Sequence, residues 1–204
     1  VTDSLSVKEY SRINNFAHVN YQSGKNLRIG KLLCINGAGI QYRWILKNLD
    51  VTSYEEMNDL AASVSVGSDG VCVIPFGNGS ERMLNNKDIG TRMVNINLNN
   101  HTKAHLCRAA LEGIAFSFVY GMDILKSDGN TVNVMRAGND NLFRSEIFSN
   151  TVATLISQDI EIYNTTGAIG AARAADLHKG DFEVFGKRIM ENDYVMTYTP
   201  FHNK

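Results

Sequence analysis

Two turns rich in glycine and asparagine hold the residues best suited to bind a ligand. Gly37 and Gly39 lie in the first turn, between the apolar run 31–35 and the helical pattern of residues 40–49. Where a strand passes into a helix in this way, backbone N–H groups and the helix dipole can hold a phosphate. A plain reversal of the chain is the commoner use of such glycines, and their spacing does not exclude it.

The same turn is a poor match to a dinucleotide-binding fingerprint. The third glycine of G-x-G-x-x-G would fall at Tyr42, which is bulky, and a helical pattern occupies the region where an acidic residue should end a second strand. A dehydrogenase is therefore the weakest of the functions considered.

The second turn lies within residues 136–143, RAGNDNLF, between another strand pattern and another helix. Ala137 and Gly138 are small enough to let the backbone approach a flat ligand. Asn139 and Asn141 can each donate and accept hydrogen bonds, as the edge of a nucleobase requires. Capping of the following helix by Asn139 or by the adjacent aspartate is the alternative. Two such turns in one domain favour a ligand site at the C-terminal ends of the strands.

Hydrophobic periodicity predicts an alternation of strands and helices around these turns. We expect strands at 16–20, 31–35, 71–76, 93–98, 132–137 and 160–163, and helices at 40–49, 54–66, 102–126, 141–157 and 167–178. Residues 77–87 are crowded with turn formers and are expected to form a surface loop. Alternating elements with short loops indicate one α/β domain over residues 1–204, with helices covering the sheet faces.

Charge and hydropathy argue against nucleic-acid and membrane partners. Lys and Arg number 20 against 21 Asp and Glu, so the net charge of -1 provides no field that would attract nucleic acid or anionic lipid. No apolar run approaches the length that crosses a bilayer, and the first residues lack the pattern of a signal peptide. We therefore expect a cytoplasmic protein.

No set of metal ligands is predicted. His101 and His105 are four residues apart on one helix, but no Glu or Cys completes a site with them, so His105 is expected to be packed. Cys34, Cys72 and Cys107 are odd in number and flanked largely by aliphatic residues. They are interpreted as small buried hydrophobic residues.

Two acidic positions are interpreted as structural. Glu81 and Arg82 could be mistaken for a catalytic pair, but a carboxylate paired with arginine is a poor general base, so we expect an ion pair that anchors the loop. Glu112 lies on the most apolar helix and is expected to be buried with a partner. Neither is assigned chemistry.

At this point the motifs resemble a known family. Residues 105–113, HLCRAALEG, resemble the second half of the FGGY sugar-kinase signature, and residues 70–82, GVCVIPFGNGSER, resemble its P-x-x-x-G-E-R loop with Ser80 inserted. Three further segments follow the family order: LLCINGAGIQYRWILKNL, VMRAGNDNLFRSEIFSN and TTGAIGAARAA. The similarity covers residues 16–177, and its wording is most like the xylulose kinases. The inserted Ser80, the alanine at 137 and a missing glycine near Asn95 depart from the family pattern.

The resemblance implies an actin-like ATPase fold of the ribonuclease H type, with a mixed sheet flanked by helices. It also implies ATP held between two lobes, with Mg²⁺ bridging the phosphates. Gly37 and Gln41 resemble the family's glycine and glutamine along the nucleotide phosphates. Ala137, Gly138 and Asn141 resemble its residues around the adenine, and the implied reaction is phosphorylation of D-xylulose to D-xylulose 5-phosphate.

The resemblance also implies what this chain lacks. In the family, the catalytic aspartate and most of the sugar pocket precede the matched region, so residues 1–204 are expected to form the C-terminal, nucleotide-side domain without the N-terminal lobe. No catalytic residue is expected here, and the isolated chain should be inactive. A kinase of another polyol or pentulose, such as glycerol, and a non-catalytic nucleotide-binding or dimerisation module are the alternatives. An exposed patch facing the missing lobe would favour association, including a homodimer.

Overall fold

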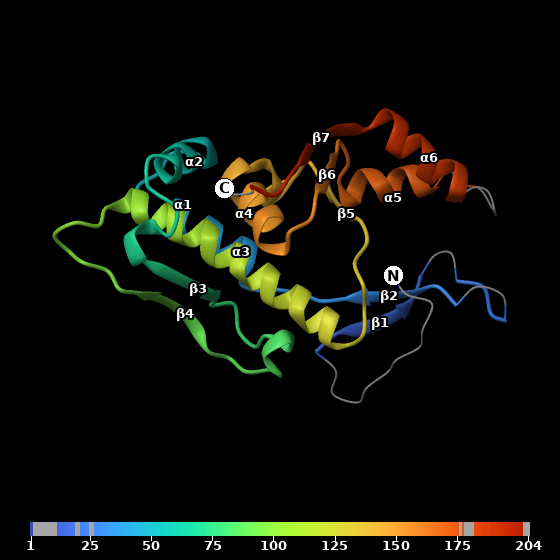
Figure 1. The fold of residues 1–204 in the computed structure, drawn as a ribbon, viewed down its shortest axis with the longest axis horizontal. Coiled ribbons are helices and arrows are strands. Elements are labelled where there is room, and N and C mark those ends of the chain that lie inside the picture. Colours follow the sequence, from blue (N-terminus) through green and yellow to red (C-terminus); the bar gives the residue numbers. More distant parts are fainter. Residues whose placement is uncertain (2–11, 19–20, 25–26, 176, 178–181, 202–204) are drawn as a thin grey trace. The chain divides into compact units, whose positions relative to one another are not determined.

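A computed structural model describes residues 1, 12–18, 21–24, 27–175, 177 and 182–201. The chain divides into two compact units, Val1–Thr131 and Val132–Lys204 (Figure 1). Within the described ranges, no helix is both long and apolar enough to cross a membrane.

The first unit contains two antiparallel strand pairs, β1 with β2 and β3 with β4. Its elements are β1 (Asn14–Ala17), β2 (Ile29–Leu32), α1 (Ala38–Asn48), α2 (Tyr54–Ala62), η1 (Ser68–Gly70), β3 (Cys72–Phe76), η2 (Arg82–Leu84), β4 (Gly90–Val94) and α3 (Lys103–Ser127). Helix α3 lies along β3 and contacts α1 and α2, so it forms the centre of this unit (Figure 1).

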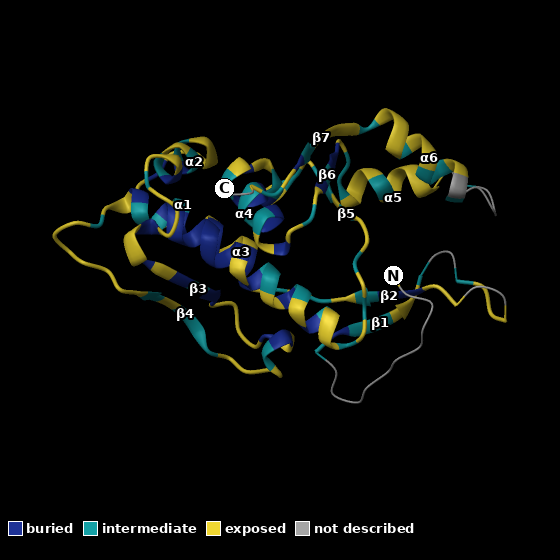
Figure 2. Ribbon diagram, viewed as in Figure 1, coloured by how far each residue is buried: buried dark blue, intermediate teal, exposed yellow. Residues whose placement is uncertain are grey.

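Small and aliphatic residues make α3 a core helix. Cys107, Leu111 and Ile114 have no exposed surface, and Figure 2 shows the middle of the helix buried. A Cβ atom added to Gly113 would lie 1.9 Å from the carbonyl oxygen of Val73, so the helix backbone rests directly on β3. This direct backbone contact explains why the residues on this face of α3 are small.

Two buried ion pairs stabilise the first unit. Lys31 Nζ lies 2.6 Å from Asp128 Oδ2, which connects β2 to the end of α3. On α3, Glu112 accepts a 2.7 Å hydrogen bond from Arg108 Nε and a 3.0 Å bond from the backbone N–H of Gly67. The predicted burial of Glu112 with a partner is confirmed.

The second unit is built on a three-stranded mixed sheet with the order β5-β6-β7. Strand β5 is parallel to β6, and β7 is antiparallel to β6. The elements are β5 (Met135–Gly138), η3 (Asn141–Arg144), α4 (Glu146–Ile156), β6 (Ile160–Tyr163), α5 (Gly167–Ala175), α6 (Phe182–Asn192) and β7 (Tyr194–Tyr198). Phe148, Val152 and Ile160 are buried, and α4 contacts β7.

Several element boundaries differ from those predicted. The strands expected at 31–35, 93–98 and 132–137 lie at 29–32, 90–94 and 135–138, and the helix expected at 141–157 is divided into η3 and α4. Helix α6 and strand β7 were not predicted. Residues 19–20, 176 and 178 of expected elements lie outside the described residues.

The predicted burial of the cysteines is correct only for Cys107. Cys34 and Cys72 are exposed, because each lies on the outward face of a short strand or the segment after it. Aliphatic neighbours in the sequence do not bury a residue when the chain is extended, since successive side chains point to opposite faces.

Candidate nucleotide site

The first turn needs a glycine because two backbones approach each other there. Gly37 immediately precedes α1, and a Cβ atom at this position would lie 1.7 Å from the carbonyl oxygen of Pro75 on β3. The second glycine of the motif is different, since a Cβ atom on Gly39 would meet nothing within 4 Å. Gly37 is therefore the residue that seats the start of α1 against β3.

The backbone N–H groups of this turn already bind a carboxylate. Glu81 has no exposed surface, its Oε1 accepts a 2.8 Å bond from the N–H of Gly37, and its Oε2 accepts a 3.0 Å bond from the N–H of Asn36. Glu81 makes these contacts in place of the predicted pair with Arg82. The turn before α1 offers the carboxylate two N–H donors and the positive end of a helix dipole. Glu81 anchors its loop, as expected, but through different partners.

Further hydrogen bonds fasten the same loop to the turn. The side-chain amide of Asn36 donates to the carbonyl oxygen of Ser80 at 2.9 Å, and that of Asn78 donates to the carbonyl oxygen of Asn36 at 3.1 Å. The N–H of Glu81 donates to the carbonyl oxygen of Lys87 at 3.0 Å. Residues 77–80 are exposed, so the expected surface loop is present and closely held.

Gln41 lies one turn into α1 and keeps an unpaired hydrogen-bond donor. Its N–H donates to the carbonyl oxygen of Gly37 at 2.9 Å, and its side chain is buried. The side-chain Oε1 accepts a 2.7 Å bond from Thr91 Oγ1, while Nε2 has no partner among the described residues. A buried donor left unpaired costs about 1–3 kcal/mol, so this atom marks a place where a polar ligand would be stabilising.

A groove of about 480 Å³ lies next to Gln41. Trp44 and Ile40 on α1 form its apolar wall and are 49% and 46% exposed. The remaining lining residues come from the β3–β4 hairpin: Gly77, Gly90, Thr91 and Met93. The groove thus combines exposed apolar surface with one buried amide, a combination typical of small-molecule sites.

The second turn ends β5 and repeats the same close approach. A Cβ atom on Gly138 would lie 2.3 Å from the carbonyl oxygen of Thr165, which follows β6. The N–H of Asn139 donates to the carbonyl oxygen of Tyr163 at 2.7 Å. Ala137 and Gly138 therefore sit where the C-terminal ends of two parallel strands meet, the edge at which open α/β sheets bind ligands.

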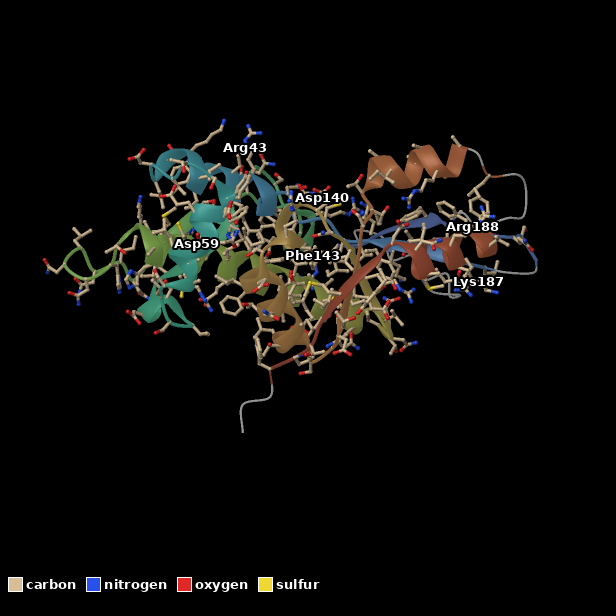
Figure 3. The ribbon with its side chains drawn as sticks, turned by 90° about the horizontal axis from the view of Figure 1, so that it is seen from above. Arg43, Asp59, Asp140, Phe143, Lys187 and Arg188 are labelled. Carbon is tan, nitrogen blue, oxygen red and sulfur yellow. The ribbon has the colours of Figure 1, made fainter. Side chains whose placement is uncertain are left out.

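Asn141 begins the short helix η3 with a left-handed backbone conformation, φ 49°. Its N–H donates to Asp140 Oδ1 at 2.7 Å, so the capping role that the sequence left open falls to Asp140. The side chains of Asn139 and Asn141 are exposed. Figure 3 shows Asp140 and Phe143 close together at this turn, with Lys187 and Arg188 of α6 at the other end of the unit.

An ion pair stiffens the strand that carries the second turn. Arg136 Nε donates to Glu161 Oε2 at 2.7 Å across β5 and β6, and the hydroxyl of Tyr163 donates to the same oxygen at 2.9 Å. The hydrogen bond from Arg136, followed by that from Tyr163, lowers the pKa of Glu161 below its usual value. The pair lies one residue before Ala137 and holds the two strand ends in register.

No group of three or more His, Cys, Asp or Glu side chains within the described ranges could hold a metal ion. His105, one of the two histidines considered as ligands, makes other contacts. Its Nδ1 accepts a 3.1 Å bond from the N–H of Thr102, and its Nε2 lies 3.2 Å from Asp69 Oδ2. The histidine closes the first turn of α3.

The predicted nucleotide residues fall into two sets. Gly37 and Gln41 lie together at the start of α1 in the first unit, and Ala137, Gly138, Asn139 and Asn141 lie together after β5 in the second. Sequence reasoning missed two residues of the first set, Glu81 as the carboxylate beneath the turn and Thr91 as the partner of Gln41. The similarity of the loop at 70–82 to a family motif was the only signal for Glu81.

Residues 23–175 match the profile of the FGGY family of carbohydrate kinases, C-terminal domain. The chain belongs to this family. The matched range includes both turns and every residue of the two sets. The predicted family is therefore confirmed.

Individual FGGY kinases are similar over parts of the chain. A xylulose kinase from Haemophilus influenzae is 32% identical over 91 residues, which are 45% of this chain and 18% of that protein. A glycerol kinase from Rhodopirellula baltica is 34% identical over 172 residues, which are 78% of this chain and 30% of that protein. The chain therefore spans less than half the length of these relatives.

Solved FGGY kinases share the fold. A glycerol kinase from Plasmodium falciparum with ADP superposes with a TM-score of 0.77 at 18% identity, covering 95% of this chain and 40% of that one. The predicted actin-like ATPase fold of the ribonuclease H type is confirmed. At this level of identity the likeness establishes the fold and not the substrate.

Proposed function

We propose that this chain is the nucleotide-side lobe of an FGGY kinase that transfers the γ-phosphoryl group of ATP to a primary hydroxyl of D-xylulose. The observation that carries the proposal is the family match over residues 23–175, which contains two turns built for close backbone approach. We infer a whole enzyme of two lobes, because the matched relatives are more than twice as long.

Each turn offers groups that suit one part of the nucleotide. The unpaired Nε2 of Gln41, beside a groove, suits a phosphate oxygen of ATP, and the glycine at 37 keeps the start of α1 close to β3. At the second turn, Ala137 and Gly138 leave room for a flat ring, and the exposed amides of Asn139 and Asn141 can read its edge. Both sets of residues fit the nucleotide that the family implies.

Mg²⁺ would be held mainly by the phosphates. This cation takes oxygen ligands and keeps several waters, so it needs few protein groups in kinases. Bound Mg²⁺ would neutralise charge on the phosphates, and this lobe would bind and orient the nucleotide.

Glycerol is the second candidate substrate. The glycerol kinase relative matches a longer part of this chain than the xylulose kinase does, at similar identity. Assay of the two-lobe enzyme with D-xylulose, glycerol and another pentulose decides between these substrates by the ratio of kcat/KM values.

Nucleotide binding by this chain is tested by thermal shift and calorimetry with Mg-ADP and Mg-ATP, and with NAD as the control. We expect Mg-ADP and Mg-ATP to stabilise the chain and NAD not to do so. Asn141→Ala should weaken it, and Asn141→Gly should weaken it equally while tolerating the positive φ at this position. A shift with NAD alone would overturn the assignment, and phosphorylation of none of the three acceptors by the two-lobe enzyme would support a non-catalytic module.

A further inference from the structure

We propose that Glu81 is a positioning residue for the phosphate-side turn. Its carboxylate binds the N–H groups of Asn36 and Gly37 and so sets where α1 begins and where Gln41 meets the nucleotide. The proposal rests on the proposed function and deepens it. Because Glu81 already occupies the backbone N–H of Gly37, the proposal gives the contact with a phosphate oxygen to the side chain of Gln41.

Helix α1 lacks the usual means of satisfying its first N–H groups. The capping position is Gly37, which offers no side-chain acceptor, and the first turn contains no acidic residue. The first N–H groups of a helix need acceptors, and a negative charge there is stabilising. Glu81 supplies a negative charge, and an acceptor for the N–H of the capping residue Gly37, from 44 residues away in the sequence.

The carboxylate is fully buried, which makes its two bonds essential. An ionised carboxylate removed from water is costly unless hydrogen bonds replace its hydration. Glu81 Oε1 and Oε2 each accept one backbone N–H, at 2.8 and 3.0 Å. A glutamine would present an N–H₂ group to one of these donors, so the change from carboxylate to amide alone would disrupt the turn.

Loss of the contact between Glu81 and the turn would change the turn and the groove at once. Gln41 is bonded to the carbonyl oxygen of Gly37, one helical turn away, and its amide is held by Thr91. The loop that leads to Glu81 starts at Gly77, which lines the same groove as Gln41. Release of Glu81 would therefore shift both the unpaired Nε2 and the opposite wall.

The experiment compares Glu81→Gln with Glu112→Gln in this chain. Glu112 is the matched control, because it is also buried and also accepts a backbone N–H, that of Gly67. Amide hydrogen exchange at Asn36 and Gly37 is followed by NMR, and Mg-ADP binding by calorimetry. We expect Glu81→Gln to raise exchange at Gly37 at least tenfold and Kd at least tenfold, whereas Glu112→Gln lowers Tm but keeps both values within twofold.

Chemical rescue separates positioning from general loss of stability. Glu81→Ala leaves a cavity beside two unpaired N–H groups, and added formate should enter it and restore Mg-ADP affinity at least in part. Glu112→Ala should show no gain in affinity with formate. Tighter Mg-ADP binding by Glu81→Ala without formate would show that the carboxylate competes with phosphate, and would overturn the proposal.

The two proposals fail in different ways. If the unaltered chain binds no Mg-ADP, the proposed nucleotide site is wrong, while exchange at Gly37 still reports whether Glu81 holds the turn. If the unaltered chain binds Mg-ADP and Glu81→Gln leaves both its Kd and the exchange at Gly37 unchanged, Glu81 has no positioning role.

Discussion

At the scale of single residues, the two turns solve the same problem. Each brings the backbone of one segment against the carbonyl oxygen of another, Gly37 against Pro75 and Gly138 against Thr165. No side chain fits between them, so the absence of Cβ is the property that matters at both positions. A ligand reaching either turn would meet backbone that is already fixed.

Gly37→Ala should destabilise the chain and impair nucleotide binding. The added Cβ would overlap the oxygen of Pro75 at 1.7 Å, so the start of α1 must shift, at a cost of about 1–3 kcal/mol. Gly39→Ala is the matched control in the same motif, with open space around its Cβ and a gain of up to about 1 kcal/mol. Urea unfolding and Mg-ADP calorimetry measure both effects, and equal behaviour of the two variants would contradict the packing argument.

Gly138→Ala should have the corresponding effect in the second unit. Its Cβ would lie 2.3 Å from the oxygen of Thr165, forcing apart the strand ends at a cost of about 1–3 kcal/mol. Gly170→Ala, in open space on α5, is the control and should stabilise by roughly 0.5–1 kcal/mol. The urea midpoint is the measurement. A loss in Gly170→Ala as large as that in Gly138→Ala would count against the explanation.

The sequence identified the glycines of the site but not their supports. A small residue in a strand-to-helix turn is a local signal, so Gly37 and Gly138 could be singled out without a structure. Glu81 and Thr91 act on residues 44 and 50 positions away, and no local pattern reports such contacts. The arginine next to Glu81 predicted an ion pair. The carboxylate instead accepts hydrogen bonds from the backbone N–H groups of the buried turn.

At the scale of elements, the β5–β6 pair carries the second turn and depends on an exposed charge pair. Arg136 lies directly opposite Glu161 in the register of the two strands. Opposite charges facing each other on one sheet face stabilise the pairing modestly. Because the pair lowers the pKa of Glu161, strand pairing becomes sensitive to acid.

Glu161→Gln should reduce the acid sensitivity of the chain. A carboxyl group with a lowered folded-state pKa adds stability above its unfolded value of 4.5, and that stability is lost as pH falls through the folded-state pKa. The fall in the urea midpoint from about pH 6 to about pH 3 should therefore be smaller in Glu161→Gln than in the unaltered chain. Arg136→Gln should flatten the profile similarly, since Arg136 is the main cause of the shift. Parallel profiles for all three proteins would refute the argument.

Elements with strong local patterns were predicted well, and those set by distant contacts were not. Strands β3 and β6 and helix α3 lie close to their predicted bounds, because apolar runs and small helix faces are local signals. Strand β4 lies at 90–94 because its register pairs Gly90 with Phe76, which alternation alone cannot reveal. Ser145 caps α4 and separates it from η3, a division that the continuous helical pattern conceals.

Helix α6 shows a pattern that could have been used. Phe182, Phe185 and Ile189 recur at helical spacing and are all partly buried, while Gly186 weakens the signal in the middle. Strand β7 pairs with β6 through its backbone, and most of its residues are exposed. Its place at the sheet edge depends on β6 more than on its own side chains.

At the scale of the whole molecule, the nucleotide residues are distributed over two compact units of one chain. The family match spans both units, from residue 23 to residue 175, and includes both turns. The superposition of this chain on the glycerol kinase of known structure covers 40% of that protein. Phosphoryl transfer needs an acceptor hydroxyl and a base in line with the γ-phosphate, and in the proposed function both belong to the other lobe.

The isolated chain should therefore bind nucleotide without transferring phosphate. We expect ADP release in a coupled assay with Mg-ATP and D-xylulose, or with glycerol, to stay at the level measured without enzyme. In the proposed function this lobe orients ATP, and the base for the acceptor hydroxyl belongs to the other lobe. A purified two-lobe xylulose kinase assayed in parallel is the positive control. Mg-ADP calorimetry on the same sample of the chain shows that it is folded and competent to bind. The contrary result would be sugar-dependent ADP release by the chain, abolished by Gln41→Met. It would place the base within residues 1–204 and would contradict its assignment to the other lobe.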